Sequence, residues 1–239
     1  MKNKKVLFRP NDKLSEKIMS APEPAKKHIP SWYKDLKPNY HGKKFPTVDS
    51  LKSDKTAKAC LPFLDSITSG YLLTMPSDLV CDFYLDGSRK ITWMSPDFNL
   101  VDVHVIEQIG GYPIPEGYDS VVFKIMGFWG IQAPKGYSLL YMHPLGRFDL
   151  PIYTFHGIVD ADKHYVPMHI PFVIKKDFKG IIKRGTPYSQ VIPILRENWE
   201  SEIKPFNENE HDPKSIFADI QLSAENWYKE KFWTRKEYL

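Results

Sequence analysis

Residues 157–193 read GIVDADKHYVPMHIPFVIKKDFKGIIKRGTPYSQVIP. Apolar residues alternate with other residues over short stretches, as at Val166, Met168 and Ile170, and glycine or proline separates the stretches. This pattern is typical of short, half-buried β-strands joined by tight turns. Such strands bury their apolar face only against other strands, so the segment predicts a mainly β fold.

Length and composition are those of one large β domain with appendages. The chain has 239 residues, and its 42% hydrophobic and 14% aromatic content excludes a disordered protein. Its 20 prolines and 13 glycines favour many short elements over long helices. The net charge is +4, and lysine and arginine are scattered except at Lys2–Lys5. This distribution does not favour nucleic acid as a partner.

The sequence also bears on metal binding and on location. The two cysteines, Cys60 and Cys81, predict neither a disulfide framework nor a zinc site. The eight histidines lack the spacing of a jelly-roll oxygenase site, so we predict no metal centre. No run of about 18 apolar residues is present, as a membrane helix would need. We therefore expect a cytoplasmic protein that does not enter a membrane.

Changes in composition divide the chain into three regions. Residues 1–57 are predicted to be an irregular arm and linker, with one helical turn capped by Ser31. Residues 58–210 are predicted to be the β domain. Residues 211–239 contain apolar residues at helical spacing, which predicts an amphipathic helix over 213–235. The helix packs on the body or on a partner, and we favour the body.

Within the body, turn signals separate several apolar runs. Asp86-Gly87 lies between two alternating runs and predicts a β-hairpin. Further strands are predicted over 101–109, 121–129 and 137–142.

Three motifs in order carry a resemblance to a known superfamily. They are Pro134-Lys135-Gly136-Tyr137, Gly157-Ile158-Val159-Asp160-Ala161-Asp162 and Lys183-Arg184-Gly185-Thr186-Pro187-Tyr188-Ser189-Gln190-Val191. Residues 131–194 thereby resemble the dUTPase and dCTP-deaminase superfamily, whose shared architecture is the β-clip. The resemblance implies a β-clip-like barrel or sandwich of short strands. It also implies a homo-oligomer, with a trimer favoured.

The resemblance further implies a nucleotide site. In this superfamily the acid after the apolar pair orients the attacking water, and the glutamine of the last turn contacts phosphate. Those residues correspond here to Asp160 and Gln190. A glycine turn at Gly185 would offer backbone N–H groups to an anion, and Mg²⁺ would be the cofactor of a nucleotide hydrolase. The alternatives are a turn or cap acid for Asp160 and a hydrogen bond closing a turn for Gln190.

A proline-bounded loop supplies the other candidates. His143, Arg147 and Asp149 lie in it, and with Asp162, Gly185 and Gln190 they complete the predicted substrate-binding set. The loop either binds an anion or is an internally hydrogen-bonded turn, and we favour the turn. Arg147 has no serine neighbour, no deaminase glutamate stands at 168–170, and the glycine-rich C-terminal arm of trimeric dUTPases is not found. These departures weigh against catalysis.

Motifs spread over most of the chain carry a closer resemblance. They are Pro24-Ala25, Ile29-Pro30 with Trp32-Tyr33-Lys34, Lys58-Ala59-Cys60 with Pro62-Phe63-Leu64-Asp65, Ser69-Gly70-Tyr71, His143-Pro144, Arg147 with Asp149-Leu150-Pro151, Gly185-Thr186-Pro187 and Gln190-Val191-Ile192-Pro193. The chain thus resembles a family of uncharacterised proteins found in tailed bacteriophages and bacteria, which implies a lineage and no activity. We predict a non-catalytic protein with a structural or nucleotide-binding role, in the host cytoplasm or the virion. The alternative is a divergent Mg-dependent nucleoside-triphosphate pyrophosphatase.

Overall fold

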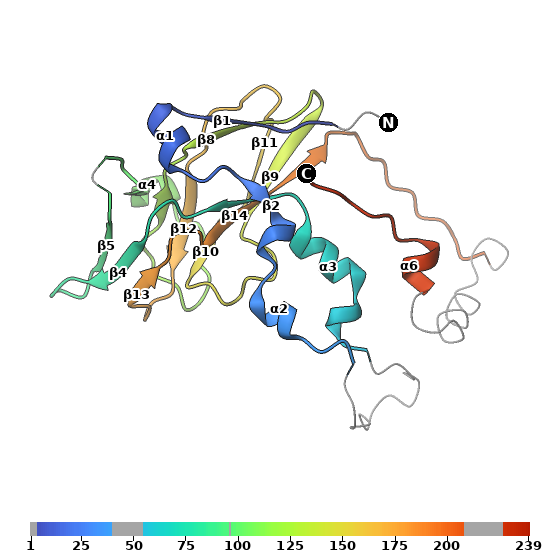
Figure 1. Ribbon diagram of the computed structural model, residues 1–239, viewed down its shortest axis with the longest axis horizontal. Coiled ribbons are helices and arrows are strands. Elements are labelled where there is room, and N and C mark those ends of the chain that lie inside the picture. The colour runs from blue at the N-terminus through green and yellow to red at the C-terminus, as the bar shows by residue number, and fades with distance from the viewer. Residues whose placement is uncertain (1–3, 40–54, 96, 208–226) are drawn as a thin grey trace. The chain divides into compact units, whose positions relative to one another are not determined.

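A computed structural model of the protein describes residues 4–39, 55–95, 97–207 and 227–239 (Figure 1). The chain divides into two compact units: the first comprises 1–28, 68–196 and 238–239, and the second comprises 29–67 and 197–237. The boundaries expected near residues 57 and 210 do not coincide with these units. The reason is that strands before residue 28 pair with strands of the first unit. Residues 40–54, within the predicted linker, lie outside the described residues.

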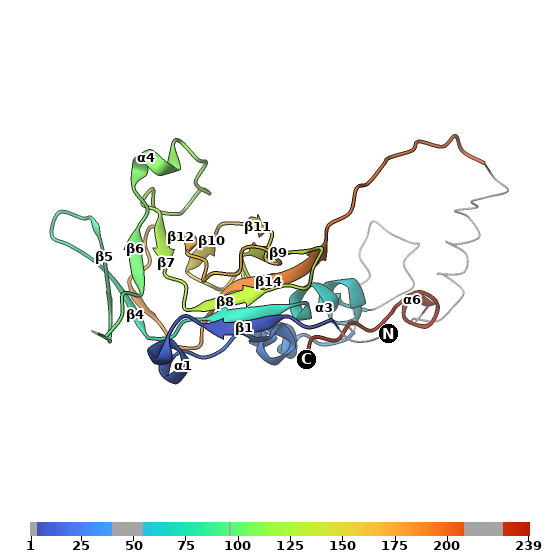
Figure 2. The same ribbon diagram turned by 90° about the horizontal axis from the view of Figure 1, so that it is seen from above.

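The first unit is mainly β, as predicted, and its strands pair antiparallel throughout the described sheets (Figures 1 and 2). The five-stranded sheet has the order β11 (Gly157–Val159), β9 (Tyr137–Met142), β14 (Pro187–Leu195), β3 (Tyr71–Thr74) and β2 (Glu23–Pro24). The four-stranded sheet has the order β10 (Ile152–Thr154), β12 (Ile170–Ile174), β7 (Phe123–Ile125) and β6 (Val101–Val103). A three-stranded sheet joins β13 (Gly180–Ile182), β4 (Leu79–Phe83) and β5 (Arg89–Trp93), and β1 (Leu7–Pro10) pairs with β8 (Trp129–Gln132).

These sheets do not close into a barrel within the described part of the chain. Closure requires each strand to have a hydrogen-bonded neighbour on both sides, whereas every one of these sheets ends in two edge strands. The barrel form of the predicted fold is therefore wrong, and only the mainly β arrangement of short strands stands.

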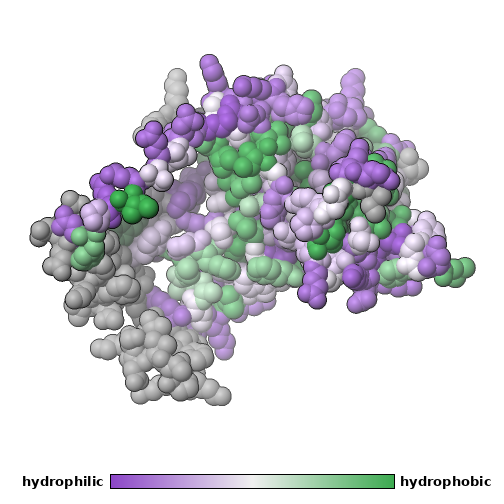
Figure 3. Space-filling view, turned by 180° about the vertical axis from the view of Figure 1, so that it is seen from behind, coloured by the Kyte–Doolittle hydropathy of each residue, from purple (hydrophilic) through white to green (hydrophobic). Residues whose placement is uncertain are grey.

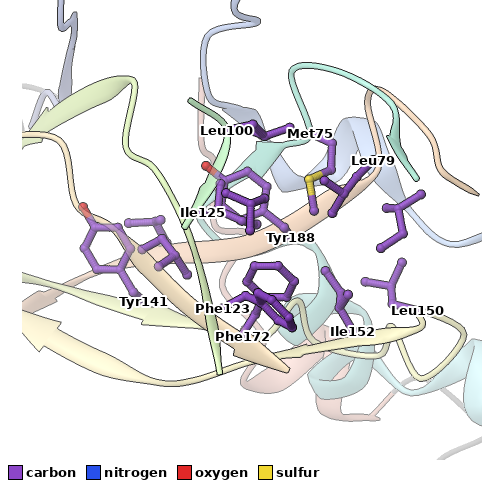
Figure 4. Packing of buried hydrophobic residues seen from close by; sticks show 14 of the residues in the cluster. Met75, Leu79, Leu100, Phe123, Ile125, Tyr141, Leu150, Ile152, Phe172 and Tyr188 are labelled. Carbon is purple, nitrogen blue, oxygen red and sulfur yellow. The ribbon is translucent and has the colours of Figure 1, made fainter. Parts of the chain in front are cut away.

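β14 is the central strand of the five-stranded sheet, and its register determines which side chains are buried. Val191 lies opposite Tyr141 on β9 and Tyr71 on β3, and it faces the core. The core side of the four-stranded sheet supplies Phe123 and Phe172, whose ring centroids lie 5.9 Å apart (Figure 4). Fully burying one such side chain stabilises the fold by about 1.5–3 kcal/mol. Residues 187–191 of β14 are buried on both faces of the sheet, and burial decreases only over the last four residues of the strand.

The hairpin predicted at Asp86-Gly87 is confirmed, since β4 and β5 pair across that turn. The strand predicted over 101–109 is wrong beyond Val103. β6 pairs with β7 over three residues only, and the chain then enters α4 (Ile106–Ile109). The apolar run 121–129 is divided between β7 and β8.

The arm expected before residue 28 is not irregular. β1 pairs with β8, and Val6 and Phe8 pack against the core. Asp12 caps α1 (Lys13–Ile18) by accepting a hydrogen bond from the Ser15 backbone at 2.7 Å. The physical reason is distant pairing: β8, more than a hundred residues further along the chain, provides the hydrogen bonds that make this segment a strand.

The second unit contains α2 (Ser31–Asp35), α3 (Leu61–Thr68) and α6 (Trp227–Lys231). The helical turn expected after Pro30 is present, but Pro30 occupies the cap position and no side chain caps the helix. The predicted helix over 213–235 falls partly on residues 208–226, outside the described residues, and its described end stops at Lys231 rather than 235. The chain leaves the helix there, and the Trp233 indole and the Lys236 ammonium donate to Asp65 at 2.9 and 2.6 Å.

Candidate functional site

Asp160, the predicted catalytic acid, lies directly after β11 in an ion pair. Ser138 Oγ donates to Asp160 Oδ1 at 2.7 Å, and Arg196 Nη1 lies 3.1 Å from the same oxygen. The Ser138 hydroxyl and the Arg196 guanidinium hold the pKa of the Asp160 carboxyl below its usual value. Asp160 is thus ionised, as a water-orienting acid would be, but one of its oxygens is committed to these two partners.

Asp162 is held more firmly than Asp160. Arg196 and Asp162 form a bidentate ion pair, in which Nη1 donates to Oδ1 at 2.8 Å and Nη2 donates to Oδ2 at 2.5 Å. The backbone N–H of Gly136 donates to the same carboxylate at 2.9 Å, and only 7% of the Asp162 side chain is exposed. Arg196 and Gly136 hold the pKa of the Asp162 carboxyl far below its usual range. Asp162 therefore joins the end of β14 to the turn before β9.

Gln190 is a buried side chain in the middle of β14. It is 1% exposed, and both ends of its amide are used. Oε1 accepts from the Leu145 N–H at 2.8 Å, and Nε2 donates to the Ser69 carbonyl at 2.7 Å. Gln190 thus ties the loop after β9 to the turn before β3. It offers no exposed donor to a phosphate.

Asp160 and Gln190 do not meet at one cleft. Gln190 lies opposite Met142 on β9, whereas the Ser138 that binds Asp160 lies opposite Ile194. Four residues of β14 separate these positions, about 13 Å at the usual rise of a strand. The paired side chains of Leu140 and Ile192 lie between them on the same sheet face. The nucleotide pocket expected from the spacing of the motifs is therefore not formed by these two residues.

The glycine turn before β14 is also occupied by internal bonds. The Gly185 N–H donates to the Met75 carbonyl at 2.8 Å, and the Thr186 N–H donates to the Lys183 carbonyl at 3.0 Å. Asp78 closes the turn from outside by accepting the Arg184 N–H at 2.7 Å. A phosphate-binding turn needs open N–H groups, and in this turn the N–H groups of Arg184, Gly185 and Thr186 are hydrogen-bonded within the protein.

The loop with His143, Arg147 and Asp149 is internally hydrogen-bonded. Arg147 donates to both oxygens of Asp149, at 2.9 and 2.8 Å. His143 Nδ1 accepts the Thr154 N–H at 3.3 Å, and Nε2 lies 3.2 Å from the Arg147 carbonyl. These contacts suit a neutral imidazole with its proton on Nε2, and burial lowers the pKa of His143. The Arg147 guanidinium pairs with its own neighbour rather than facing an open cleft.

A magnesium site is not supported by these residues. Both oxygens of Asp162 accept hydrogen bonds, and Asp160 pairs with the arginine that binds Asp162. In the described part of the chain, no group of three or more histidine, cysteine, aspartate or glutamate side chains is placed to hold a metal ion. Mg²⁺ prefers carboxylate oxygens that are free to bind it.

No sequence motif singles out several residues that contact the predicted site. Arg196, which pairs with both acids, carries no motif that would single it out. Tyr112, Tyr118, Tyr153 and Phe155 form a connected group of rings beside the His143 loop. Their signal was the alternation Ile152-Tyr153-Thr154-Phe155, which places aromatic residues on the outer face of a strand.

A comparison of the chain with known protein families finds no match, and neither does a comparison with curated proteins. Among the helices that the structure describes, none has the length and apolar content needed to cross a membrane. Figure 3 shows that the face seen from behind is largely hydrophilic, with separate hydrophobic areas.

Proposed function

We propose that this chain is a non-catalytic structural protein of the phage-type lineage that its motifs resemble. The proposal rests on one observation: the residues of the predicted site use their hydrogen bonds to hold the fold together. Gln190 is buried, and both ends of its amide form hydrogen bonds. The Gly185 N–H donates to the Met75 carbonyl, and Arg196 donates to the Asp162 carboxylate. Gln190, Gly185 and Asp162, which the resemblance would place near a nucleotide, link strands and turns of the fold here.

Self-association belongs to the same proposal. β11 stands at the edge of the five-stranded sheet and is three residues long, with neither proline nor charge in it. Its Ile158 is 64% exposed and lies in register with Leu140 on β9. The unpaired N–H and C=O groups of an edge strand can pair with another chain, and Ile158 adds exposed apolar surface at this edge. We propose a homo-oligomer, as the resemblance to the β-clip proteins implies, with a trimer as the expected form.

The alternative function is a divergent Mg-dependent nucleoside-triphosphate pyrophosphatase. One observation favours it: the Asp160 side chain is 54% exposed, so its second oxygen lies within reach of a water molecule. The β-clip-like architecture that the sequence resembles also belongs to this alternative. The bonded states of Gln190 and Gly185 weigh against it, because phosphate binding would first have to break those contacts.

One experiment separates the two functions. Pyrophosphate release is measured with dUTP and the four common deoxynucleoside triphosphates in the presence of Mg²⁺, for the wild type and for Asp160→Asn. The structural proposal expects both proteins to match the buffer blank. Release by the wild type that is lost in Asp160→Asn would establish the pyrophosphatase instead. Sedimentation of the same wild-type sample tests self-association, since a monomer at all concentrations would remove that part of the proposal.

A further inference from the structure

The outer face of the four-stranded sheet is polar at Lys124 and Asp102, which form an ion pair on β7 and β6, but it is aromatic at the β10 edge. On β10, Ile152 and Thr154 are buried, so the alternation turns Tyr153 to the opposite face. Phe155 follows two residues later and is likewise half-buried. Tyr153 lies in register with Val173 on β12, which is fully buried, so the rings cover part of this face of the sheet. The ring surface that stays exposed, chiefly that of Tyr112, is available to a ligand.

The rings form one connected row. The Tyr112 centroid lies 4.9 Å from that of Phe155, Phe155 lies 6.3 Å from Tyr153, and Tyr153 lies 6.0 Å from Tyr118. His143 stacks on Tyr153 at 5.2 Å and supports it from the protein side. Tyr112 is 52% exposed at the end of the row. The row thus presents ring surface to solvent on a rigid base.

The loop that follows α4 (Figure 2) is fixed at its Tyr118 end by contacts with residues 175–176. Tyr118 forms a β-bridge with Lys175, and the Lys176 N–H donates to the Gly117 carbonyl at 2.9 Å. Arg89, nearly fully buried, donates to Asp119 at 2.7 Å and to the carbonyls of Lys175 and Lys176 at 2.9 and 2.8 Å. A surface fixed by so many contacts loses little entropy on binding a ligand.

A shallow hollow of about 340 Å³, open to solvent, adjoins the row at Tyr118. This volume lies within the range of small-molecule sites, about 300–1,000 Å³. Its polar lining is mixed: Glu116 brings a carboxylate, Ser120 a hydroxyl and Lys176 an ammonium group. No ion pair of Glu116 or Lys176 is found in the part of the chain that the structure describes. Asp119, on the same wall, is already neutralised by Arg89.

The charges of the lining select the class of ligand. Phosphate groups are held best by cations and open N–H donors, whereas this hollow is lined by two carboxylates, of Glu116 and Asp119, and one ammonium, of Lys176. Sugar hydroxyls both donate and accept hydrogen bonds, so they suit a lining that has both kinds of group. The C–H faces of a sugar ring pack on aromatic rings through dispersion and weak hydrogen bonds. We propose that the Tyr112–Phe155–Tyr153–Tyr118 row and the adjoining hollow bind a neutral saccharide chain.

Saturation-transfer NMR with four neutral hexasaccharides tests the proposal: β-1,4-linked glucose, N-acetylglucosamine and mannose, and α-1,4-linked glucose. At least one should bind the full-length protein with a Kd of about 1 mM or tighter. Tyr112→Ala should weaken that binding about tenfold, and Glu116→Gln should weaken it severalfold. Tyr84→Ala is the matched control, because Tyr84 is 55% exposed on the β4–β5 hairpin and should be dispensable.

Thermal unfolding of each variant shows whether it is folded, and Glu116→Gln replaces Tyr112→Ala if the latter is not. The proposal is overturned if none of the four saccharides binds, or if the folded row variant binds as tightly as Tyr84→Ala. Binding of deoxythymidine monophosphate that depends on Tyr112 and excludes the saccharide would also overturn it, because the ligand would then be a charged nucleotide.

Discussion

Replacing Gln190 with methionine tests whether this side chain belongs to the scaffold. Methionine has a similar volume, so Gln190→Met removes both hydrogen bonds without opening a large cavity. It leaves the Leu145 N–H and the Ser69 carbonyl without their partner on β14. Both hydrogen bonds are part-buried, so each group left unsatisfied costs about 1–2 kcal/mol, in the lower part of the range for buried groups. We therefore expect the free energy of unfolding to fall by about 2–4 kcal/mol.

The assay is urea unfolding followed by tryptophan fluorescence, with the free energy extrapolated to water. Gln132→Met is the control, because Gln132 makes one exposed contact, from Arg9 at 3.2 Å. That variant should change the free energy by less than about 0.5 kcal/mol. If Gln190→Met is as stable as Gln132→Met, the hydrogen bonds of Gln190 do not hold the fold, and its assignment as a scaffold residue fails.

Three further changes probe the same scaffold. Gly70→Ala should cost at least about 3 kcal/mol of stability, because its Cβ would lie 2.1 Å from a backbone oxygen of β14. Gly87→Ala is its control: Gly87 has a similar positive φ, but no atom lies within 4 Å of the added Cβ, so the cost should be only about 1–2 kcal/mol. The pKa of Asp162 is held below its unfolded value of 3.8, so the unfolded chain gains the proton first and stability is lost as the pH falls below that value. In Asp162→Asn, the urea midpoint should therefore depend less on pH over this acid range. Burial lowers the pKa of His143 below 6.5, so the unfolded chain gains the proton first and stability should decline as the pH falls through 6.5; the decline should be weaker in His143→Gln.

Local pattern predicted the strands that bury one face against the nearest part of the core. β9 was expected over 137–142 and found there, and the β4–β5 hairpin formed at the predicted Asp-Gly turn. The pattern failed where a distant partner decides the structure. The lysine-rich sequence around Val6 and Phe8 predicts an irregular tail, whereas pairing with β8 makes this segment a strand whose Val6 and Phe8 pack on the core. Val105 continues the alternation of β6, yet the strand ends because β7 pairs with only three residues of it.

The candidate site shows the same limit. The sequence supplied the correct residue types for a nucleotide site, but spacing along the chain does not say which groups meet. Asp160 and Asp162 converge on Arg196, which stood outside every motif. Gln190 was expected in a turn and lies instead inside β14, where a polar side chain must find buried partners. A motif gives the type and spacing of its residues, so it does not distinguish an acid or amide that stabilises the fold from one that takes part in catalysis.

The most direct measurement of the central claim is amide hydrogen exchange, read by NMR on the protein without added nucleotide. The N–H groups of Gly185, Leu145 and Gly136 donate to Met75, Gln190 and Asp162. We predict that all three exchange slowly and only with global unfolding. Fast exchange at Gly185 or Leu145 would contradict the account, since it would mean that the turn and the loop keep their donors open, as an anion-binding site must.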